Sequence, residues 1–570
     1  AEEVEQVLDL PARCRDLADL GSRATFPFQE RASFAAAVYA LEGGDLDAVR
    51  VALARHAGSV WAGRGESQTQ WQMLEAAAGL IQACEDRSRH LSEHSRSLDA
   101  LLDFYLGSLH AVDRAQREFE AAAGDLLDPA GELAAAASQA RRAYRRLADQ
   151  VQGLFLRHLA RSGWPPAGRL ANADLFDRLV TPRLSESGRR VALLLIDALR
   201  YELGLALHTH LVGAGHAGAE VQPAFAHLPT ITPVGMASLL PDAGQALRLL
   251  RRNDQLTPAL GEQILTSVSQ RMAVLRARYG QRFAEATLGD FLRPTFELPT
   301  TAELLVLRSN EMDRDFENDP ETALSLLSRT FQQVRQAARK LAELGFDDAL
   351  IVTDHGFFLN PETGAGDACA RPPGTWLAVH ERLLLGDGAE DAANALFDAA
   401  ALGMRGDFGQ AASPRAMTAY RAGATYLHGG VSLQEAVAPV IVLPLRRAEP
   451  AAALWRPPAV TLSYKQGAKR ITTRLPVIDI SVDLGELGSA AAAVELLLEA
   501  QDRQGNVVGE ARPGGPVNPA TRLVSLQAGQ SARVTVQMQL DFEGKFSVKA
   551  LDPTTLALLD KLDLETDYTV

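Results

Sequence analysis

Aspartate and histidine side chains follow apolar segments of the chain at several separate places. Asp197 directly follows VALLLI, Asp354 and His355 directly follow ALIVT, and Asp313 follows LLVLRSNEM. His428 stands in ATYLHGGVSLQE, shortly before a further apolar segment. Carboxylate oxygens and imidazole nitrogens together form a ligand set that suits two divalent cations. Each aspartate alone also has a simpler explanation, because an aspartate after a strand is often a helix N-cap.

Two threonine hydroxyls stand in the segment HLPTITPVGMASLLP, next to prolines and before a run of small residues. Exposed amides and the dipole at a helix N-terminus would stabilise the alkoxide of Thr230 or Thr232, which suits a nucleophile. Thr232 is explained equally well as an N-cap with Pro233 at the first helical position. Only the presence of possible metal ligands elsewhere in the chain favours a role as nucleophile over a role as N-cap.

The elements that position these residues are predicted to form an α/β domain over residues 186–445. Apolar runs at 191–196, 303–307, 348–354 and 438–445 predict strands buried on both faces, as in parallel sheets. A strong helix is predicted between Pro320, in its first turn, and Gly345, at its end. Strands that alternate with helices predict a doubly wound, mostly parallel sheet, whose functional groups gather beyond the carboxyl ends of the strands.

The segments on either side of this domain have different patterns. Residues 1–180 carry apolar positions at spacings of three and four, which predicts a helical domain. Four histidines in it lack carboxylates at useful spacing and are interpreted as core or surface residues: His90, His94, His110 and His158. Residues 459–570 contain short alternating runs and turn residues, which predict a small immunoglobulin-like β-sandwich.

Composition narrows the class of protein. The 570 residues favour about three domains, and 57 Lys+Arg against 71 Asp+Glu give a net charge of −14. That charge argues against a protein that coats duplex DNA, although a local metal site could still attract phosphate. The three cysteines are far apart and form no disulfide framework, so we expect a reducing, cytoplasmic compartment.

The two ends of the chain and its hydropathy give three further expectations. No segment is apolar over the ~18 residues that a membrane span needs, so we expect no membrane partner. The chain begins AEEVEQVLDL, without a methionine, so we expect further residues upstream. The sequence does not specify an oligomeric state.

The segments LLLIDALRYE, LPTITPVGMASLLP, LIVTDHGF and HGGVSLQE together resemble the PglZ domain of the alkaline phosphatase superfamily, in the expected order. The resemblance implies that Asp197, Thr232, Asp354 and His355 bind one metal, with Thr232 as the attacking residue. It implies that Asp313 and His428 bind the other. The two bound metal ions could be zinc, manganese or magnesium.

One position departs from the superfamily pattern. The second metal there usually has an Asp-x-x-x-His pair, whereas the fourth residue after Asp313 in this chain is Glu317. A glutamate could still coordinate, and its harder oxygen would favour Mn or Mg over Zn. Asp315 and Asp319 are rival ligands.

The resemblance implies a metal-dependent phosphohydrolase in which Thr232 attacks phosphorus and a phospho-threonine is then hydrolysed. Arg200 or Arg308 could bind the nonbridging oxygens. The segment TPVGM lacks the Cys/Ser-x-Pro-x-Arg motif of sulfatases, so sulfatase chemistry is not expected. Residues 242–300 are the expected cap, with basic residues at 248–255 and 271–282 that could guide a polyanion or simply form a solvated face.

Proteins with this domain resemble components of bacterial BREX phage-defence systems. The expected substrate is therefore a phosphodiester of a nucleotide or nucleic acid, and the expected partners are other BREX proteins. A phosphomonoesterase that acts on a small metabolite is one alternative. The other is a catalytically inactive, phosphatase-like scaffold that assembles such partners. The missing histidine after Asp313 and the acidic net charge favour that alternative.

Overall fold

The computed structural model describes most of the chain. The described residues are 1–14, 25–60, 65–126, 128, 131–213, 216, 218–252, 255–362, 368–378, 381–445, 459–483, 493–503, 507–518, 522–527, 529–539, 542–553 and 558–568. The chain divides into two compact units, and each is described by itself. The first comprises residues 1–205, 220–327 and 345–444, and the second comprises residues 206–219, 328–344 and 445–570.

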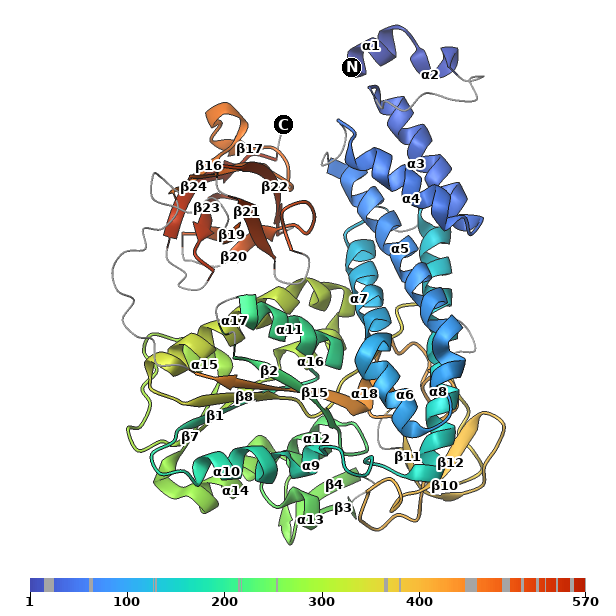
Figure 1. Ribbon diagram of the computed structural model, residues 1–570, viewed down its shortest axis with the longest axis vertical. Coiled ribbons are helices and arrows are strands. Elements are labelled where there is room, and N and C mark those ends of the chain that lie inside the picture. Colours follow the sequence, from blue (N-terminus) through green and yellow to red (C-terminus); the bar gives the residue numbers. More distant parts are fainter. Residues whose placement is uncertain are drawn as a thin grey trace. The chain divides into compact units, whose positions relative to one another are not determined.

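A six-stranded sheet forms the centre of the first unit, in the order β2-β15-β8-β1-β7-β6 (Figure 1). Its strands are β1 (Val191–Ile196), β2 (Glu220–Phe225), β6 (Phe283–Thr287), β7 (Leu304–Ser309), β8 (Asp348–Val352) and β15 (Val437–Pro444). Strands β8, β1, β7 and β6 pair in parallel, whereas β15 is antiparallel to both of its neighbours. The predicted α/β class with a mostly parallel sheet is confirmed.

Apolar side chains on both faces of the strands let helices cover the sheet. On one face Leu193 and Val306 join a buried cluster with Phe176 and with Met272 of α14 (Val268–Tyr279). On the other face α11 (Tyr201–Gly213) approaches β15 closely, because a Cβ at Gly204 would lie 2.2 Å from the Pro439 Cβ. The remaining helices among these strands are α12 (Thr232–Ser238), α13 (Ala243–Ala246), α15 (Leu288–Leu292), α16 (Glu311–Asn318), α17 (Pro320–Glu343) and α18 (Leu433–Ala436), with a 3-10 turn at Gly280–Arg282.

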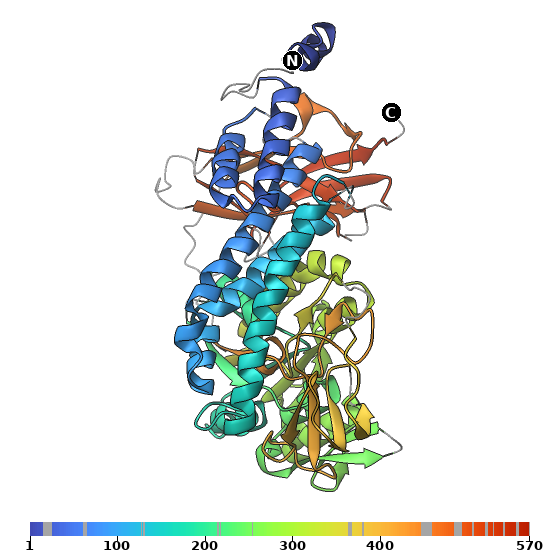
Figure 2. The ribbon, with the colours of Figure 1, turned by 90° about the vertical axis from the view of Figure 1, so that its right-hand side faces the viewer.

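The N-terminal segment is helical up to Leu184. Its helices are α1 (Glu2–Val7), α2 (Leu10–Arg13), α3 (Pro27–Glu42), α4 (Leu46–Ala57), α5 (Gly65–His90), α6 (Leu98–Phe104), α7 (His110–Gly124), α8 (Ala134–Ser162), α9 (Asn172–Leu175) and α10 (Thr181–Leu184). A 3-10 turn spans Leu91–His94, and π-helical turns span Tyr105–Leu109 and Phe176–Val180. Figure 2 shows α5, α7 and α8 packed lengthwise against one another.

These helices cluster with the sheet in the first compact unit. Their apolar side chains continue into the α/β part. The Phe155 ring meets Trp164 edge to face at 5.7 Å, and Trp164 meets Phe225 of β2 at 5.3 Å. The Trp164 indole also donates to the Ala226 carbonyl at 2.8 Å. The pattern of apolar residues therefore predicts the helices, but it cannot predict that their core is shared.

Two insertions extend from the sheet. The expected cap contains an antiparallel sheet of β3 (Leu247–Arg252), β4 (Gln255–Leu260) and β5 (Gln263–Ile264), and its later part returns to the main sheet as β6. The second insertion has no counterpart in the sequence analysis. It is the sheet β10-β11-β13-β12, made of β10 (Gly374–Ala378), β11 (Leu384–Gly388), β12 (Asn394–Asp398) and β13 (Gln410–Pro414).

A two-residue ladder closes the second insertion at its base. Phe358 and Leu359, of β9 (Phe358–Leu359), pair with Leu427 and Tyr426 of β14 (Tyr426–Leu427). Fully buried Arg382 of the insertion also forms an ion pair with fully buried Glu435, at 3.3 Å. The ladder joins the two ends of the insertion, and the ion pair holds a residue of its interior to the main body.

The second unit is built around a mostly antiparallel sheet in the C-terminal segment, in which only β17 and β24 pair in parallel among the described strands. Its strands are β16 (Ala459–Ser463), β17 (Arg470–Ile471), β18 (Val477–Asp483), β19 (Ala493–Asp502), β20 (Val507–Ala511), β21 (Leu523–Gln527), β22 (Ser531–Met538), β23 (Lys545–Leu551) and β24 (Leu558–Thr566), with a 3-10 turn at Lys465–Gly467. Strands β16 and β24 touch, so the sheet closes over its own apolar core. Across both units, none of the described helices is long and apolar enough to cross a membrane.

Gly204→Ala is expected to lower the free energy of unfolding by about 1–3 kcal/mol, because the added methyl group overlaps Pro439. Urea denaturation measures the change. Gly153→Ala on α8 is the matched control, since its Cβ would meet only Arg157 Nη1 at 4.0 Å. Helix propensity then predicts a gain of about 0.5–1 kcal/mol for the control. Equal shifts for the two variants would contradict the close packing of α11 on β15.

Candidate active site

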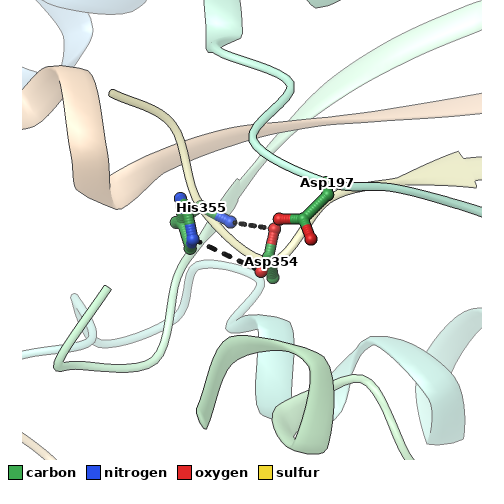
Figure 3. Close-up of side chains that lie close together, drawn as sticks. All are labelled: Asp197, Asp354 and His355. Atoms are coloured by element: carbon green, nitrogen blue, oxygen red, sulfur yellow. Dashed lines mark hydrogen bonds and ion pairs between the residues drawn. The ribbon is translucent and has the colours of Figure 1, made fainter. Parts of the chain in front are cut away.

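The first cluster of possible ligands lies at the carboxyl ends of two adjacent strands. Asp197 follows β1, and Asp354 and His355 follow β8, which pairs with β1 in parallel. One ligand atom from each residue lies within 4.8 Å of the other two, and all three residues are buried. Figure 3 shows the three side chains turned toward one another. Parallel pairing brings residues that are far apart in sequence to one edge of the sheet.

The two carboxylates of this cluster are only partly satisfied by the protein. Asp354 Oδ1 accepts from the backbone amides of Ala198 at 3.2 Å and His355 at 3.0 Å. Asp354 Oδ2 and Asp197 Oδ1 are buried and accept no hydrogen bond from the described residues. Ala198 has φ +57, a left-handed conformation that costs a non-glycine residue about 1–2 kcal/mol. This strain turns its amide toward Asp354.

Burial and the neighbouring carboxylates act together on Asp197. Desolvation is the largest cause, and the charges of Asp354 and Asp313 add to it, so the pKa of Asp197 is raised well above its ordinary value. A divalent cation between the carboxylates would remove this penalty. The orphaned oxygens and the hard donor set therefore fit a metal ion.

His355 is oriented to offer its outer nitrogen to this cluster. Its Nδ1 lies 3.0 Å from the Gly356 carbonyl, which can only accept, so Nδ1 carries the proton. The Nε2 lone pair is left on the side of Asp354, 3.4 Å from its Oδ2. A backbone carbonyl that fixes the tautomer in this way is the usual outer partner of a metal-binding histidine.

Thr232 brings a hydroxyl to the same place. Its Oγ1 lies 3.4 Å from His355 Nε2, and the residue is only partly buried. Thr232 is the first helical residue of α12 and Ile231 occupies the N-cap position, so the simple N-cap explanation does not hold. Thr230 is fully buried and donates to the Gly430 carbonyl at 2.8 Å. Of the two threonines, only Thr232 faces the cluster.

The second cluster contains Asp313, Glu317 and His428, whose ligand atoms also lie within 4.8 Å of one another. Asp313 and Glu317 are one turn apart on α16, and His428 follows β14. His428 Nε2 lies 3.7 Å from Glu317 Oε1, while its Nδ1 faces the Thr230 carbonyl at 3.2 Å. The rings of His355 and His428 stack at 4.7 Å, which places the two clusters next to each other.

Electrostatics and hydrogen bonds tie the second cluster together. Burial lowers the pKa of His428, but the ion-pair contact with Glu317 and the charge of Asp313 outweigh it, so the net shift is upward. The Tyr426 hydroxyl donates to Asp313 Oδ1 at 2.7 Å. Tyr426 was not predicted from the sequence as a site residue. Its position two residues before His428 was the one feature of the sequence that could have indicated it.

The two rival carboxylates are engaged elsewhere. Asp315 pairs with Arg314 at 2.9 Å, and Asp319 accepts from the Thr322 hydroxyl at 2.6 Å. Glu317 therefore completes the cluster geometrically, at the position where the superfamily has histidine.

Two glycines allow backbone to approach the first cluster. A Cβ at Gly235 of α12 would lie 2.6 Å from the Asp354 Cβ. A Cβ at Gly356 would lie 2.2 Å from the Gln434 carbonyl oxygen. Close packing of backbone thus requires glycine at both positions.

The structure corrects the expectation for Arg200. Its side chain is fully buried and donates to Glu202 at 2.7 Å and to the Asp113 carbonyl at 3.0 Å, so it holds the N-terminal helices rather than a substrate. Arg308 pairs with Glu285 of β6 at 3.0 Å. A different residue, Arg271, is buried in α14, where desolvation lowers its pKa against the charges of Asp354 and Asp197.

Three arginines of the basic segment 271–282 are paired with carboxylates. Arg276 pairs with Glu285 and Arg278 with Asp242 inside the cap, and Arg282 pairs with Glu303 just after it. These pairs favour a solvated face over a track for a long polyanion.

Comparison with known proteins agrees with the resemblance seen in the motifs. Residues 175–443 match the model of the "BREX system PglZ alkaline phosphatase-like domain". The chain is also similar to "Alkaline phosphatase-like protein PglZ" of Bacillus cereus (strain H3081.97), with 22% identity over 403 residues. That match covers 66% of this chain and 44% of the relative, so the chain spans less than half of the relative's length. Both clusters and Thr232 fall within the matched residues.

Asp197→Asn is expected to stabilise metal-free protein, by about 1–2 kcal/mol at pH 7.5, because it removes one of two adjacent buried charges. A carboxyl whose pKa is raised on folding costs stability as pH rises through its ordinary pKa near 3.8. The gain should therefore be smaller at pH 4.5. Urea denaturation in the presence of a chelator measures both values.

Asp103→Asn is the control for this substitution, since Asp103 is 68% exposed in a surface ion pair with Arg169. Its effect should stay within about 0.5 kcal/mol. A loss of stability for Asp197→Asn at pH 7.5 would contradict the electrostatic argument.

Proposed function

Because residues 175–443 form a PglZ alkaline phosphatase-like domain, we propose that the chain is a metal-dependent phosphohydrolase that cleaves phosphodiesters of nucleotides or nucleic acid. The observation that carries the proposal is the pair of adjacent ligand clusters with the Thr232 hydroxyl 3.4 Å from one of them. A two-metal site with a hydroxyl nucleophile is a known arrangement for phosphoryl transfer. The matched domain by itself supports a hydrolase of the alkaline phosphatase superfamily, without specifying the substrate.

Each cluster would hold one divalent ion. Asp197, Asp354 and His355 would bind the first ion next to Thr232, and Asp313, Glu317 and His428 would bind the second. When bound, such ions neutralise phosphate charge and lower the pKa of an adjacent hydroxyl or water. With four carboxylates among six ligands, manganese or magnesium fits at least as well as zinc.

The residues of the chain would then act in order. Thr232 Oγ1 attacks phosphorus, the leaving oxygen departs, and a phospho-threonine remains on α12 until water hydrolyses it. The carbonyls of Gly356 and Thr230 keep His355 and His428 in the ligand tautomer throughout. Arg271 is the buried guanidinium whose charge acts on this site, and it would bind the nonbridging oxygens in place of Arg200.

The family match also supports a proposal for the cellular setting. We propose that the chain works in a bacterial BREX phage-defence system, in the cytoplasm and together with other BREX proteins. The pairing of Arg276, Arg278 and Arg282 with carboxylates supports a short nucleotide or a single phosphodiester more than a long polyanion.

Thr232→Ala is expected to lower kcat for bis-p-nitrophenyl phosphate by on the order of a thousandfold or more, because the nucleophile is lost. Thr232→Ser keeps the hydroxyl and should retain substantial activity. Hydrolysis is followed as release of p-nitrophenolate, with p-nitrophenyl phosphate as the monoester comparison. Unchanged cleavage by Thr232→Ala would refute the proposed nucleophile, and faster hydrolysis of the monoester would refute the diesterase assignment.

Glu317→Ala is expected to lower the metal content from about two ions per chain to about one, because it removes one of the three second-cluster ligands. Asp315→Ala, on the same helix but paired with Arg314, should keep both ions. Elemental analysis of protein equilibrated with manganese measures the stoichiometry. Two ions bound by Glu317→Ala would exclude Glu317 as a ligand.

A further inference from the structure

A cavity of about 400 Å³ lies between α7, α8 and residues 358–362, and none of its lining residues belongs to either ligand cluster. Helices α7 and α8 lie side by side within the first unit (Figures 1 and 2). The volume falls in the range of small-molecule sites in proteins. The cavity is therefore large enough for a ligand of its own.

The Gln116 carboxamide is the unusual feature of this cavity. Gln116 is only 1% exposed and lines the cavity, yet neither its Nε2 nor its Oε1 has a hydrogen-bond partner within the described part of the chain. A buried amide without partners is costly and rare in native proteins. It offers one donor and one acceptor side by side, and a ligand with the complementary edge would satisfy both.

The charged walls of the cavity are held rigidly in place. Arg141 forms a two-pronged pair with Glu120, with Nε at 3.1 Å and Nη2 at 2.7 Å. Arg145 donates from Nε to Asp149 at 3.3 Å and from Nη1 to Asn360 at 2.9 Å. Such fixed guanidinium groups lose little conformational freedom when they bind a ligand.

Two guanidinium groups of the cavity keep donors to spare. Arg145 Nη2 makes no hydrogen bond to the described residues, and its side chain is 22% exposed. Arg142 is exposed and its one hydrogen bond to a described residue runs from Nη1 to Ser138. These free edges match the geometry of a phosphate group.

One side of the cavity is apolar. The rings of Tyr144 and Phe358 stack at 5.6 Å with an angle of 11° between their planes. Both residues line the cavity, so the edges of this stacked pair form an apolar wall for a bound ring.

We propose that this cavity binds a purine nucleotide, with the Gln116 carboxamide on the donor–acceptor edge of the base and the free guanidinium edges of Arg142 and Arg145 on the phosphate. The three arginines are balanced by three carboxylates of Glu120, Asp149 and Glu362, so a bare inorganic anion meets no net positive charge. A base that pairs with the buried amide explains the cavity better than charge alone. The proposal is independent of the phosphohydrolase function.

Calorimetric titration of the full chain with adenosine 5′-monophosphate, in the presence of a chelator, tests the proposal. One binding site is expected. Gln116→Met keeps the side-chain shape but removes both amide groups, and it should weaken binding by about tenfold or more. The same substitution should raise the melting temperature of ligand-free protein, because an unpaired buried amide is lost. That rise also shows that the variant is folded.

Two further variants sharpen the result. Gln150→Met, at an exposed glutamine of α8, should change neither the affinity nor the melting temperature. Arg145→Gln should weaken adenosine monophosphate about tenfold but leave adenosine almost unaffected.

Three outcomes would overturn the proposal: no binding of adenosine monophosphate at millimolar concentration, equal binding by Gln116→Met, or binding lost on Asp354→Asn, which would place the nucleotide at the catalytic clusters. A cavity filled by water or by a partner's peptide would give the first of these.

Discussion

The structure of the candidate site depends on one electrostatic constraint, the burial of Asp197 and Asp354 at the ends of adjacent parallel strands. Two carboxylates so placed repel each other, and burial raises the pKa of Asp197 in addition. The protein compensates this charge only in part, through the backbone amides of Ala198 and His355, which donate to Asp354. Asp197 Oδ1 and Asp354 Oδ2 have no hydrogen-bond partner among the described residues, an arrangement that fits a bound cation. The strained turn at Ala198, the close glycine Gly235 and the fixed tautomer of His355 all keep this arrangement in place without it.

The N-terminal helices contribute to the rigidity of the site more than their distance in sequence suggests. Asp113 of α7 accepts from the hydroxyls of Tyr105 and Tyr144 and from the Gln434 amide, at 2.8, 2.7 and 3.1 Å. Glu202, next to the first cluster in sequence, accepts from both Arg117 and Arg200. These groups are buried, so breaking any one pair would leave an unpaired charge in the interior. The helical segment is therefore part of the support of the strand ends.

The sequence predicted the parts of the structure that follow from periodicity and strand order. Continuous apolar runs predicted β1, β7, β8 and β15, and ligands placed after strands predicted which residues would meet. The sequence could not predict contacts between distant segments. The guanidinium of Arg200 suggested a phosphate contact, yet Arg200 donates to Glu202, two residues along the chain, and to the carbonyl of Asp113, which only the packing of α7 brings close. The strands of the second insertion were not predicted, because they are short and their apolar residues do not alternate regularly. Strand β6 was not predicted, because it is defined by its pairing with β7, which is distant in sequence.

The two-residue ladder between β9 and β14 has a consequence for how such a domain can diversify. His355 and His428 flank this ladder, so their spacing is set by Phe358 and Leu427 and not by the chain between them. The entropic cost of closing a loop with this ladder rises by only about 0.6 kcal/mol for each doubling of the loop's length. The segment between the strands can therefore lengthen, shrink or be exchanged while both histidines keep their places. Access to the two clusters can change in evolution without any change in the residues that form them.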